Sequence, residues 1–452
     1  MSYHPSWRGV TFHDVVPEGT LTPRAFLEDC LERIAEREPV VRAFTAMNVE
    51  DARAVADAAT ARRAAGRPLS AIDGMPIAIK DLIETRDMPT QMGCAAYAGN
   101  FPKRDSAMIQ ALREAGAVIL AKAVTTELGQ SEPGPTTNPW NPRHTPGGSS
   151  SGSAAAVAAG FVPVAIGTQV GGSIIRPAAY CGNWALKPSQ GAIHRGERQG
   201  TSQSTAGPHA NCAEDAWLVA REISRRVGGD PGHPGLQGPF TVPEPQRPIR
   251  IGVMRTEIWD RIPAAARDAF EQLVRSLSVE VLWPEEHPLL AAFEKRLSHA
   301  NAVGGRITSF ENRWSLCNLP RDKLAARTLA RLDISMTYTA EDYHVALVER
   351  QAMRAAHAAL APVVDMLIAP SCPGPAPVWD PLAPDADDNP RPTGDAACNA
   401  GTSALGAPAV TMPLLAVGGL PMGAQVVCQP GEDARAIAYA RWLYTHTPAV
   451  VV

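Results

Sequence analysis

The run Gly147-Gly148-Ser149-Ser150-Ser151-Gly152-Ser153 decides the fold and the chemistry that we predict for this chain. A second glycine-flanked serine, Ser173 in Gly171-Gly172-Ser173-Ile174, follows 24 residues after Ser149. Upstream, Lys80 stands at the end of the apolar segment 76–79. A buried lysine that accepts a proton, a serine that bridges and a serine that attacks form a hydrolytic device in which lysine does the work of histidine.

Each of these three signals also has a simpler explanation. A lone Gly-Gly-Ser can be explained as a tight turn, and Lys80 as a surface residue at a strand end. The Gly147–Ser153 run can be explained as a flexible linker or a phosphate cradle. A linker would not lead directly into the small apolar residues that follow, and a Walker-type loop requires a Gly-Lys-Ser/Thr ending that is absent. The apolar neighbours of Lys80 would desolvate its amine and lower its pKa. The set of signals, in this order, favours the hydrolytic device.

A serine hydroxyl is a poor nucleophile at neutral pH, so the surroundings of Ser173 must assist it. Gly171 and Gly172 allow unusual backbone angles and a close approach of a substrate carbonyl. We therefore predict an oxyanion hole from the backbone of Val170, Gly171, Gly172 and Ser173. One preorganised donor of this kind contributes roughly 3 to 4 kcal/mol.

The chain resembles the amidase signature family. The resemblance is strongest over residues 70–210, and outlying segments also match, namely the alanine-rich helix before Gly74-Met75-Pro76, 406–413, 419–425 and 432–433. It implies that Lys80 is the base, that Ser149 is the bridging serine after a cis peptide bond, and that Ser173 is the acyl-enzyme nucleophile. It also implies an α/β/α fold around a large mixed sheet, with no metal and no cofactor.

Family position also suggests supporting residues and a substrate pocket. The supporting residues are Gly148, Ser150, Gln169 and Arg176. The substrate-binding residues are Met92, Gly93, Thr126, Glu127, Gln130 and Ser131. The 125–135 loop and residues 255–350 are the expected pocket walls. Arg313, Trp314 and Tyr338 either line the entrance or belong to the core and the surface.

Three departures from the family pattern predict a distinct subgroup. The family carries Asp four residues before the nucleophile and Arg two residues after it, where this chain has Gln169 and Ile175; Arg176 follows one position later. Because both charges are absent together, no buried charge loses its partner and activity is expected to persist. The usual Ser-Leu-Asp is replaced by Ser202-Gln203-Ser204, which alters a wall near the site.

Composition excludes several classes of protein. The chain has 452 residues and a net charge of -4, which argues against nucleic-acid binding and against a polybasic membrane contact. Its eight cysteines form no C-x-x-C pair and no His-rich cluster, as expected for free thiols in a reducing cytoplasm without structural zinc. The N-terminus lacks the features of a signal peptide, and the most apolar stretches are too short and glycine-rich for a membrane span.

Periodicity predicts an α/β fold with an inserted helical block. The predicted helices are 22–37, capped by Thr22, and 49–65, 106–115, 151–160, 213–227 and 432–445, with a mainly helical block at 263–360. The predicted strands are 75–79, 118–121, 162–167, 250–254, 366–370, 409–413 and 423–427. We divide the chain into N-terminal helices (1–70), the amidase signature core (71–230), an inserted helical region forming a pocket wall (231–360) and C-terminal strands with a helix (361–452).

The predicted function is hydrolysis of a carbon–nitrogen bond, other than a peptide bond, through an acyl- or carbamoyl-enzyme on Ser173. A neutral amide, anilide or carbamate (urethane) is the expected small-molecule substrate, because no charge cluster for a carboxylate or phosphate is evident in the sequence. The alternatives are the catalytic subunit of a glutamine-dependent amidotransferase, which needs a second chain as its partner, and a degenerate scaffold within a complex. We expect a cytoplasmic protein with no nucleic-acid or membrane partner, and the sequence is compatible with a homodimer.

Overall fold

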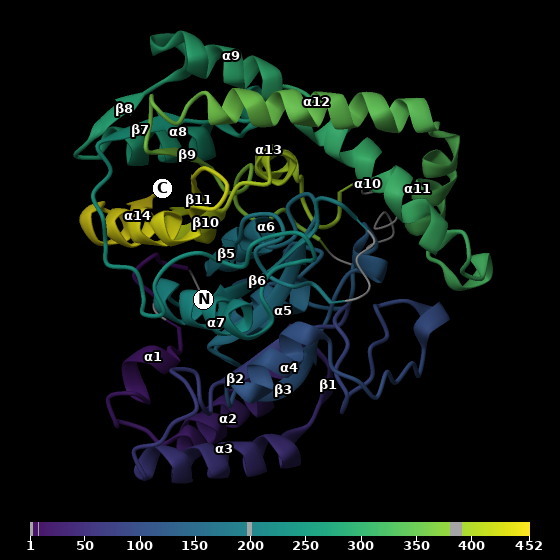
Figure 1. Cartoon of the computed structure of the whole chain (residues 1–452), viewed down its shortest axis with the longest axis vertical. Coiled ribbons are helices and arrows are strands. Elements are labelled where there is room, and N and C mark those ends of the chain that lie inside the picture. The colour runs from purple at the N-terminus through teal and green to yellow at the C-terminus, as the bar shows by residue number, and fades with distance from the viewer. Residues whose placement is uncertain (1–2, 8, 197–200, 380–390) are drawn as a thin grey trace.

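One large mixed β-sheet organises the chain, with helices on its outside (Figure 1). The computed structural model describes residues 3–7, 9–196, 201–379 and 391–452. Within these ranges the sheet has 12 strands in the order β1-β3-β2-β4-β6-β5-β10-β11-β9-β7-β8, and β12 pairs with β10. The strands are β1 (Phe44–Met47), β2 (Pro76–Lys80), β3 (Val118–Ala123), β4 (Val164–Gln169), β5 (Trp184–Lys187), β6 (Thr205–Ala210), β7 (Arg250–Val253), β8 (Glu280–Leu282), β9 (Met366–Pro370), β10 (Ala409–Val417), β11 (Leu420–Val427) and β12 (Val450–Val451).

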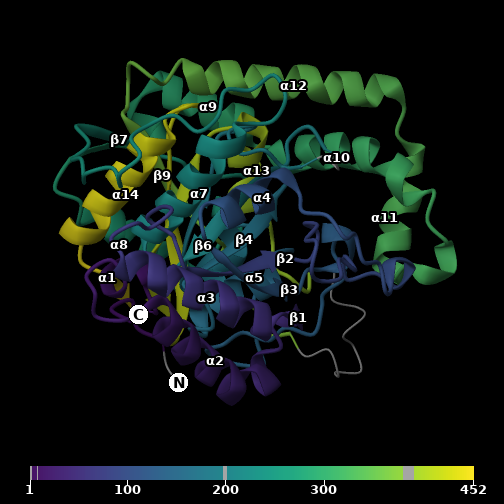
Figure 2. The ribbon, with the colours of Figure 1, turned by 60° about the horizontal axis from the view of Figure 1, so that its bottom comes forward.

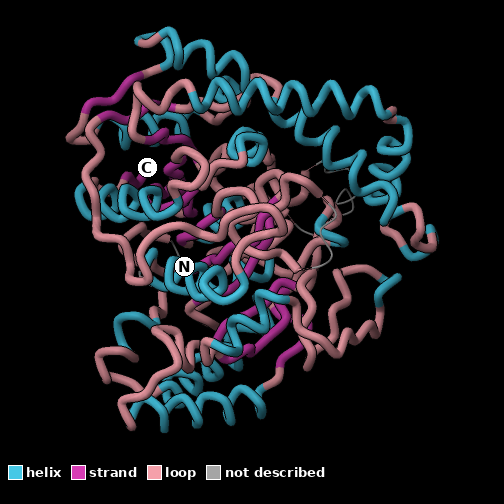
Figure 3. Tube along the Cα trace, viewed as in Figure 1, coloured by secondary structure: helices cyan, strands magenta, loops and turns pink. Residues whose placement is uncertain are grey.

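The helices surround the strands on both faces, as the tube in Figure 3 shows. They are α1 (Phe12–Val15), α2 (Pro23–Val41), α3 (Val49–Ala64), α4 (Ala107–Glu114), α5 (Ser151–Ala158), α6 (Ile175–Cys181), α7 (Ala213–Val227), α8 (Ala264–Arg275), α9 (Pro288–Leu297), α10 (Ala300–Leu316), α11 (Ala326–Thr337), α12 (Ala340–Ala358), α13 (Ala397–Leu405) and α14 (Asp433–His446). No helix in the described ranges is long and apolar enough to cross a membrane.

Parallel pairing brings two functional segments to one edge of the sheet. Strand β2 runs parallel to both β3 and β4. The carboxyl ends of parallel neighbours meet at the same edge, where α/β proteins place their binding sites. Lys80 ends β2 and Gln169 ends β4, so the lysine and the turn that carries Ser173 begin side by side.

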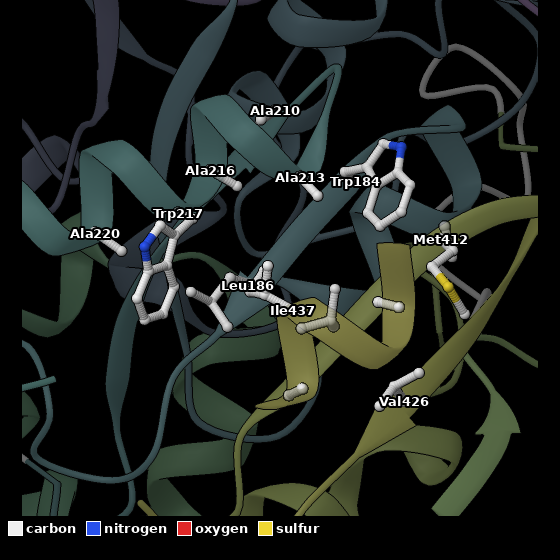
Figure 4. Close-up of a cluster of buried hydrophobic side chains, with 14 of the residues drawn as sticks. Trp184, Leu186, Ala210, Ala213, Ala216, Trp217, Ala220, Met412, Val426 and Ile437 are labelled. Atoms are coloured by element: carbon white, nitrogen blue, oxygen red, sulfur yellow. The ribbon is translucent and has the colours of Figure 1, made fainter. Parts of the chain in front are cut away.

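The two faces of the sheet carry side chains of different size. On one face, large residues from the strands pack with α4, α7, α8 and α14; Figure 4 shows Trp217 of α7, Leu186 of β5 and Ile437 of α14 in this cluster. On the other face, alanines from β2 and β4 meet the alanine-rich helix α5. Side chains alternate along a strand, so Lys80 faces the same side as Ala78, toward α5.

Helices α10, α11 and α12 form an arm along one side of the molecule, seen from a second direction in Figure 2. Within this arm, α10 and α11 supply one wall of the main cavity. A second core cluster joins α9, α10 and α12 to the small-residue face of the sheet. The arm is therefore packed on the body of the protein and shapes the site.

The predicted fold class is confirmed: the chain is a mixed α/β protein with an inserted helical block. The Thr22 cap is confirmed as well, since its side chain accepts a hydrogen bond of 3.1 Å from the Ala25 N–H. The sequence missed β1, β5, β6, β8, β12, α1, α6 and α13. One sheet runs through all four segments into which we divided the chain, and that division stays a prediction.

Candidate active site

Lys80 is fully buried and lies among hydroxyl groups. Its Nζ lies 2.7 Å from Ser149 Oγ, 3.0 Å from Ser150 Oγ and 2.9 Å from Thr168 Oγ1. Burial, together with the positive charge of Arg176, holds the pKa of Lys80 well below its ordinary value of 10.5. A lowered pKa favours the neutral amine, which is the form of lysine that can take up a proton from a bonded hydroxyl.

The glycine-serine loop holds Ser149 against the lysine. The Gly148–Ser149 peptide bond is cis, and Gly147 has a positive φ of 82°. A side chain at Gly147 would also collide with the backbone of Pro177, 2.8 Å from the added Cβ. Arg176 Nη2 donates a hydrogen bond of 2.5 Å to Gly148 O. The loop is thus fixed by its own backbone and by one buried guanidinium.

The turn that carries Ser173 is braced by an uncharged side chain. Gln169 Oε1 accepts hydrogen bonds from the N–H groups of Ile174 and Ile175, at 2.8 and 3.0 Å. Its Nε2 donates to Ser403 Oγ at 3.0 Å, and Ser403 Oγ donates to Gly171 O at 2.8 Å. Ile175 is fully buried in the apolar core. The amidase signature pattern has charged residues at these two positions. In this chain the amide of Gln169 and the apolar side chain of Ile175 occupy them.

Ser149 and Ser173 border the same cavity, whose volume is about 950 Å³. Val170, Gly171 and Gly172 also line it, so the backbone predicted to hold an oxyanion faces the space where a substrate would lie. No group of three or more His, Cys, Asp or Glu side chains in the described part of the chain is placed to hold a metal ion.

The structure divides the expected substrate-binding residues into two sets. Met92, Gln130 and Ser131 line the cavity. Glu127 does not; its carboxylate accepts hydrogen bonds from Ala325 N and Thr328 Oγ1 and so fixes the start of α11.

Two more expected pocket residues, Thr126 and Gly93, also lie outside the cavity lining. Thr126 Oγ1 donates to Gln130 O at 2.8 Å. A Cβ on Gly93 would lie 2.9 Å from Thr125 O, so glycine allows two loops to pack closely. These residues shape the loop that bears Gln130 and Ser131.

Arg313, Trp314 and Tyr338 belong to the packing of the helical arm. Arg313 Nη1 donates to Tyr338 O at 2.5 Å, and its guanidinium lies over the Trp314 ring. Trp314 is 56% exposed. These contacts fit the interpretation that the three residues belong to the core and the surface, and not the interpretation that they line the cavity entrance.

A buried histidine that the sequence did not single out lies behind Lys80. His209 on β6 faces the α5 side of the sheet, and both of its ring nitrogens lack a hydrogen-bond partner among the described residues. A Cβ on Gly167 would lie 2.6 Å from His209 Nε2 and 2.8 Å from Ser150 Oγ, which explains the glycine. Burial, the largest cause, lowers the pKa of His209 to about 3, so the ring is neutral at pH 7. Its position directly after Gly207-Pro208 was the available signal.

The cavity is positively charged, so the expectation of no charge cluster is wrong. Of the described residues, four arginines and a single carboxylate line it; these are Arg176, Arg195, Arg331, Arg391 and Asp395. Arg195 pairs with Asp230, and Arg391 pairs with Asp395. The sequence could not show this, because the four arginines come from four distant segments.

Comparison with known proteins gives the family. The model of the Amidase family matches residues 25–437. The chain therefore belongs to the amidase signature family. It is 33% identical, over 96% of both chains, to the A subunit of the glutamyl-tRNA(Gln) amidotransferase of Chloroflexus aurantiacus.

Solved structures agree with this assignment. An inhibitor-bound protein described in connection with the origins of an s-triazine catabolic enzyme superposes with a TM-score of 0.84 at 27% identity, covering 98% of this chain and all of that one (100%). The native peptide amidase of Stenotrophomonas maltophilia superposes with a TM-score of 0.72 at 26% identity, covering 96% and 95% of the two chains.

Proposed function

We propose that this protein hydrolyses a carbon–nitrogen bond of an amide or carbamate, other than a peptide bond, through an acyl- or carbamoyl-enzyme on Ser173. The observation that carries the proposal is the buried amine of Lys80 at 2.7 Å from Ser149 Oγ, beside a cavity that Ser149 and Ser173 both line; burial also holds the pKa of Lys80 well below its ordinary value. A buried amine of this kind is suited to general base catalysis near neutral pH.

Acylation then proceeds by proton transfer along the two serines. Ser173 Oγ attacks the substrate carbonyl while its proton passes to Ser149 Oγ, and the Ser149 proton passes to Lys80 Nζ. The tetrahedral intermediate carries a negative oxygen, which backbone N–H groups between Val170 and Ser173 stabilise. When the intermediate collapses, the proton returns through Ser149 to the leaving nitrogen, the C–N bond breaks and an amine departs.

Deacylation uses the same groups in the same order. Lys80, again neutral, takes a proton from water through Ser149, and the hydroxide equivalent attacks the ester or carbamate on Ser173. The second tetrahedral intermediate collapses, and Ser173 Oγ leaves with the returned proton. The products are an amine and a carboxylic or carbamic acid, and no cofactor is consumed.

Covalent labelling tests the proposal directly. A fluorophosphonate should add once to the wild-type protein, and peptide mass mapping should locate the adduct on Ser173. The reaction requires an activated serine. An adduct on another residue, or none at all, would contradict the assignment.

Replacing Ser149 with alanine should lower kcat by about 100- to 10,000-fold and leave a small residual rate, because a water molecule can carry the proton less well than a positioned hydroxyl. Steady-state kinetics on an anilide would measure this. Ser151→Ala is the matched control, since within the described residues its buried hydroxyl bonds only to Val124 O, at 3.4 Å, and it should keep most of the activity. Equal losses in both variants would point to a disturbed loop instead of a lost relay.

Replacing Arg176 with methionine should move the acid limb of the kcat/KM profile to higher pH. The positive charge of Arg176 disfavours the ammonium form of Lys80 and so lowers its pKa; without that charge the pKa rises, and a higher pH is needed for the neutral amine. Arg176→Lys keeps the charge and should keep the limb nearer its original position. An unmoved limb in the methionine variant would show that Lys80 does not sense Arg176.

A second candidate function is the catalytic subunit of a glutamine-dependent amidotransferase. The curated relatives support it, because the similarity to these amidotransferase chains covers 96% of both proteins. Release of ammonia from glutamine, together with a second chain that co-purifies with this one, would favour this function. Hydrolysis of anilides by the isolated chain, with no glutaminase activity, would favour the stand-alone hydrolase.

A further inference from the structure

Arg331 on α11 is a cavity-lining arginine without an acidic partner in the described part of the chain. Its Nη1 donates a hydrogen bond of 3.1 Å to Ser131 Oγ, and no carboxylate of the described residues pairs with it. An arginine has five N–H donors in a planar fork, so this bond leaves most of them available. Burial lowers the pKa of Arg331, and the neighbouring titratable group that acts on that pKa is the Tyr338 hydroxyl.

The acidic residues nearest along the same elements are engaged elsewhere. Glu132 pairs with Arg327, and Glu127 accepts from the backbone and hydroxyl groups at the start of α11. Asp333, on the same helix, pairs with Arg321 on the surface. Burying a charged guanidinium without an acidic partner costs free energy, and a bound anion would offset that cost.

The position of Arg331 separates it from the reacting bond. Gly129 borders Ser149, because a Cβ on it would lie 3.7 Å from Ser149 Oγ. Ser131, which holds Arg331, follows two residues later, and two residues of chain span about 7 Å at most. Arg331 therefore lies along the cavity wall near Ser149, and a short segment of substrate would separate a group bound at Arg331 from the reacting bond.

Arg176, the other cavity arginine for which the described residues supply no carboxylate partner, is a poorer place for an anion. Its Nη2 is already bonded to Gly148 O, and it contributes to the low pKa of Lys80. An anion bound there would favour the ammonium form of Lys80 and so oppose the base. An anion bound at Arg331 lies further from the lysine.

We propose that Arg331, held in place by Ser131, binds a carboxylate of the substrate, so that the substrate is an amide or carbamate with an anionic group a few bonds from the scissile C–N bond. The inference rests on the proposed function of the same cavity. A planar carboxylate matches the two-pronged guanidinium and can form two parallel hydrogen bonds with it. The leucines and methionine at the cavity wall, Leu82, Met92 and Leu316, suit an apolar spacer.

The test measures binding without turnover, in the Ser173→Ala background. The ligands are glutaranilic acid and valeranilide, which differ in a carboxylate or a methyl group at the end of one acyl chain, and a second pair with and without a carboxylate on the aniline ring. We expect one carboxylated ligand to bind at least 10-fold more tightly than its neutral partner by calorimetry. Adding Arg331→Gln should bring that ratio within about 2-fold of unity.

Three further variants and one further ligand make the outcome decisive. Arg331→Lys and Ser131→Ala should each reduce the ratio partially, while Arg296→Gln on the exposed face of α9 should leave it unchanged. An ω-phosphonate analogue that binds more tightly than the carboxylate would make the subsite a phosphate site. Equal affinity within both pairs, or no binding of either carboxylated ligand at 1 mM, would overturn the proposal. Failure of the hydrolase proposal would appear separately, as absence of the fluorophosphonate adduct on wild-type protein.

Discussion

Replacing Ser173 with alanine should lower kcat/KM by about 10,000-fold or more and remove the fluorophosphonate adduct. The variant loses the atom that forms the covalent intermediate, and enzymes that use a serine nucleophile keep only the small rate contributed by binding and the oxyanion hole. Progress curves on an anilide and intact-mass measurement would give the two readouts. Because Gly171, Gly172 and the Gln169 brace remain, the fold should be unaffected.

Ser204→Ala is the matched control for this variant. Ser204 lines the same cavity, but no buried amine lies within hydrogen-bond distance of its hydroxyl among the described residues. It should still be labelled at Ser173. If Ser173→Ala kept most of the wild-type rate, the nucleophile would be a different residue, and Ser149 beside Lys80 would be the next to examine.

Replacing Lys80 with methionine should lower kcat by about 1,000-fold and remove the pH dependence of its acid limb. General base catalysis by a positioned group contributes about 100- to 10,000-fold, and methionine fills the space without accepting a proton. Lys80→Arg should be equally impaired, because a guanidinium is not deprotonated in proteins. A pH profile of kcat/KM for the three proteins is the measurement.

The Lys80→Met variant should fold at least as stably as the wild type at pH 7. The unfolded chain holds this lysine protonated below its ordinary pKa of 10.5, whereas the folded protein holds it neutral down to a much lower pH. The unfolded state thus binds the extra proton, so the stability contributed by this site rises with pH between the two pKa values. A large fall in Tm for Lys80→Met would mean that the lost activity reflects unfolding.

The sequence was sufficient to predict the fold class, and it singled out Lys80 and Ser149, whose side chains the structure places 2.7 Å apart. Lys80 and the two serine loops each belong to a short contiguous motif. Such a motif can be recognised in the sequence without knowing how the chain folds. Strand β6 was missed because Thr205–Ala210 contains Gly and Pro, which normally mark a turn. The structure explains the glycine: a Cβ on Gly207 would lie 2.1 Å from Leu186 O on the neighbouring strand.

Features that depend on distant segments could not be predicted. The contact between Arg331 and Ser131 joins residues 200 positions apart, and that between Gln169 and Ser403 joins residues 234 positions apart. A sequence contains the arginines but does not say which of them face one cavity. For that reason the sequence could not predict the sign of the charge in the cavity. It also could not predict that the absence of a side chain at Gly167 leaves space for His209.

The amide of Gln169 gives the turn that carries Ser173 a brace that does not titrate. A carboxylate in that place would weaken as an acceptor on protonation, and acid would then disturb the geometry of Ser173 as well as the base. Here the acceptor bonds to Ile174 and Ile175 are the same in acid as at neutral pH. The geometry of the turn that carries Ser173 should therefore stay the same on mild acidification, and protonation of Lys80 would lower the rate without loosening that turn.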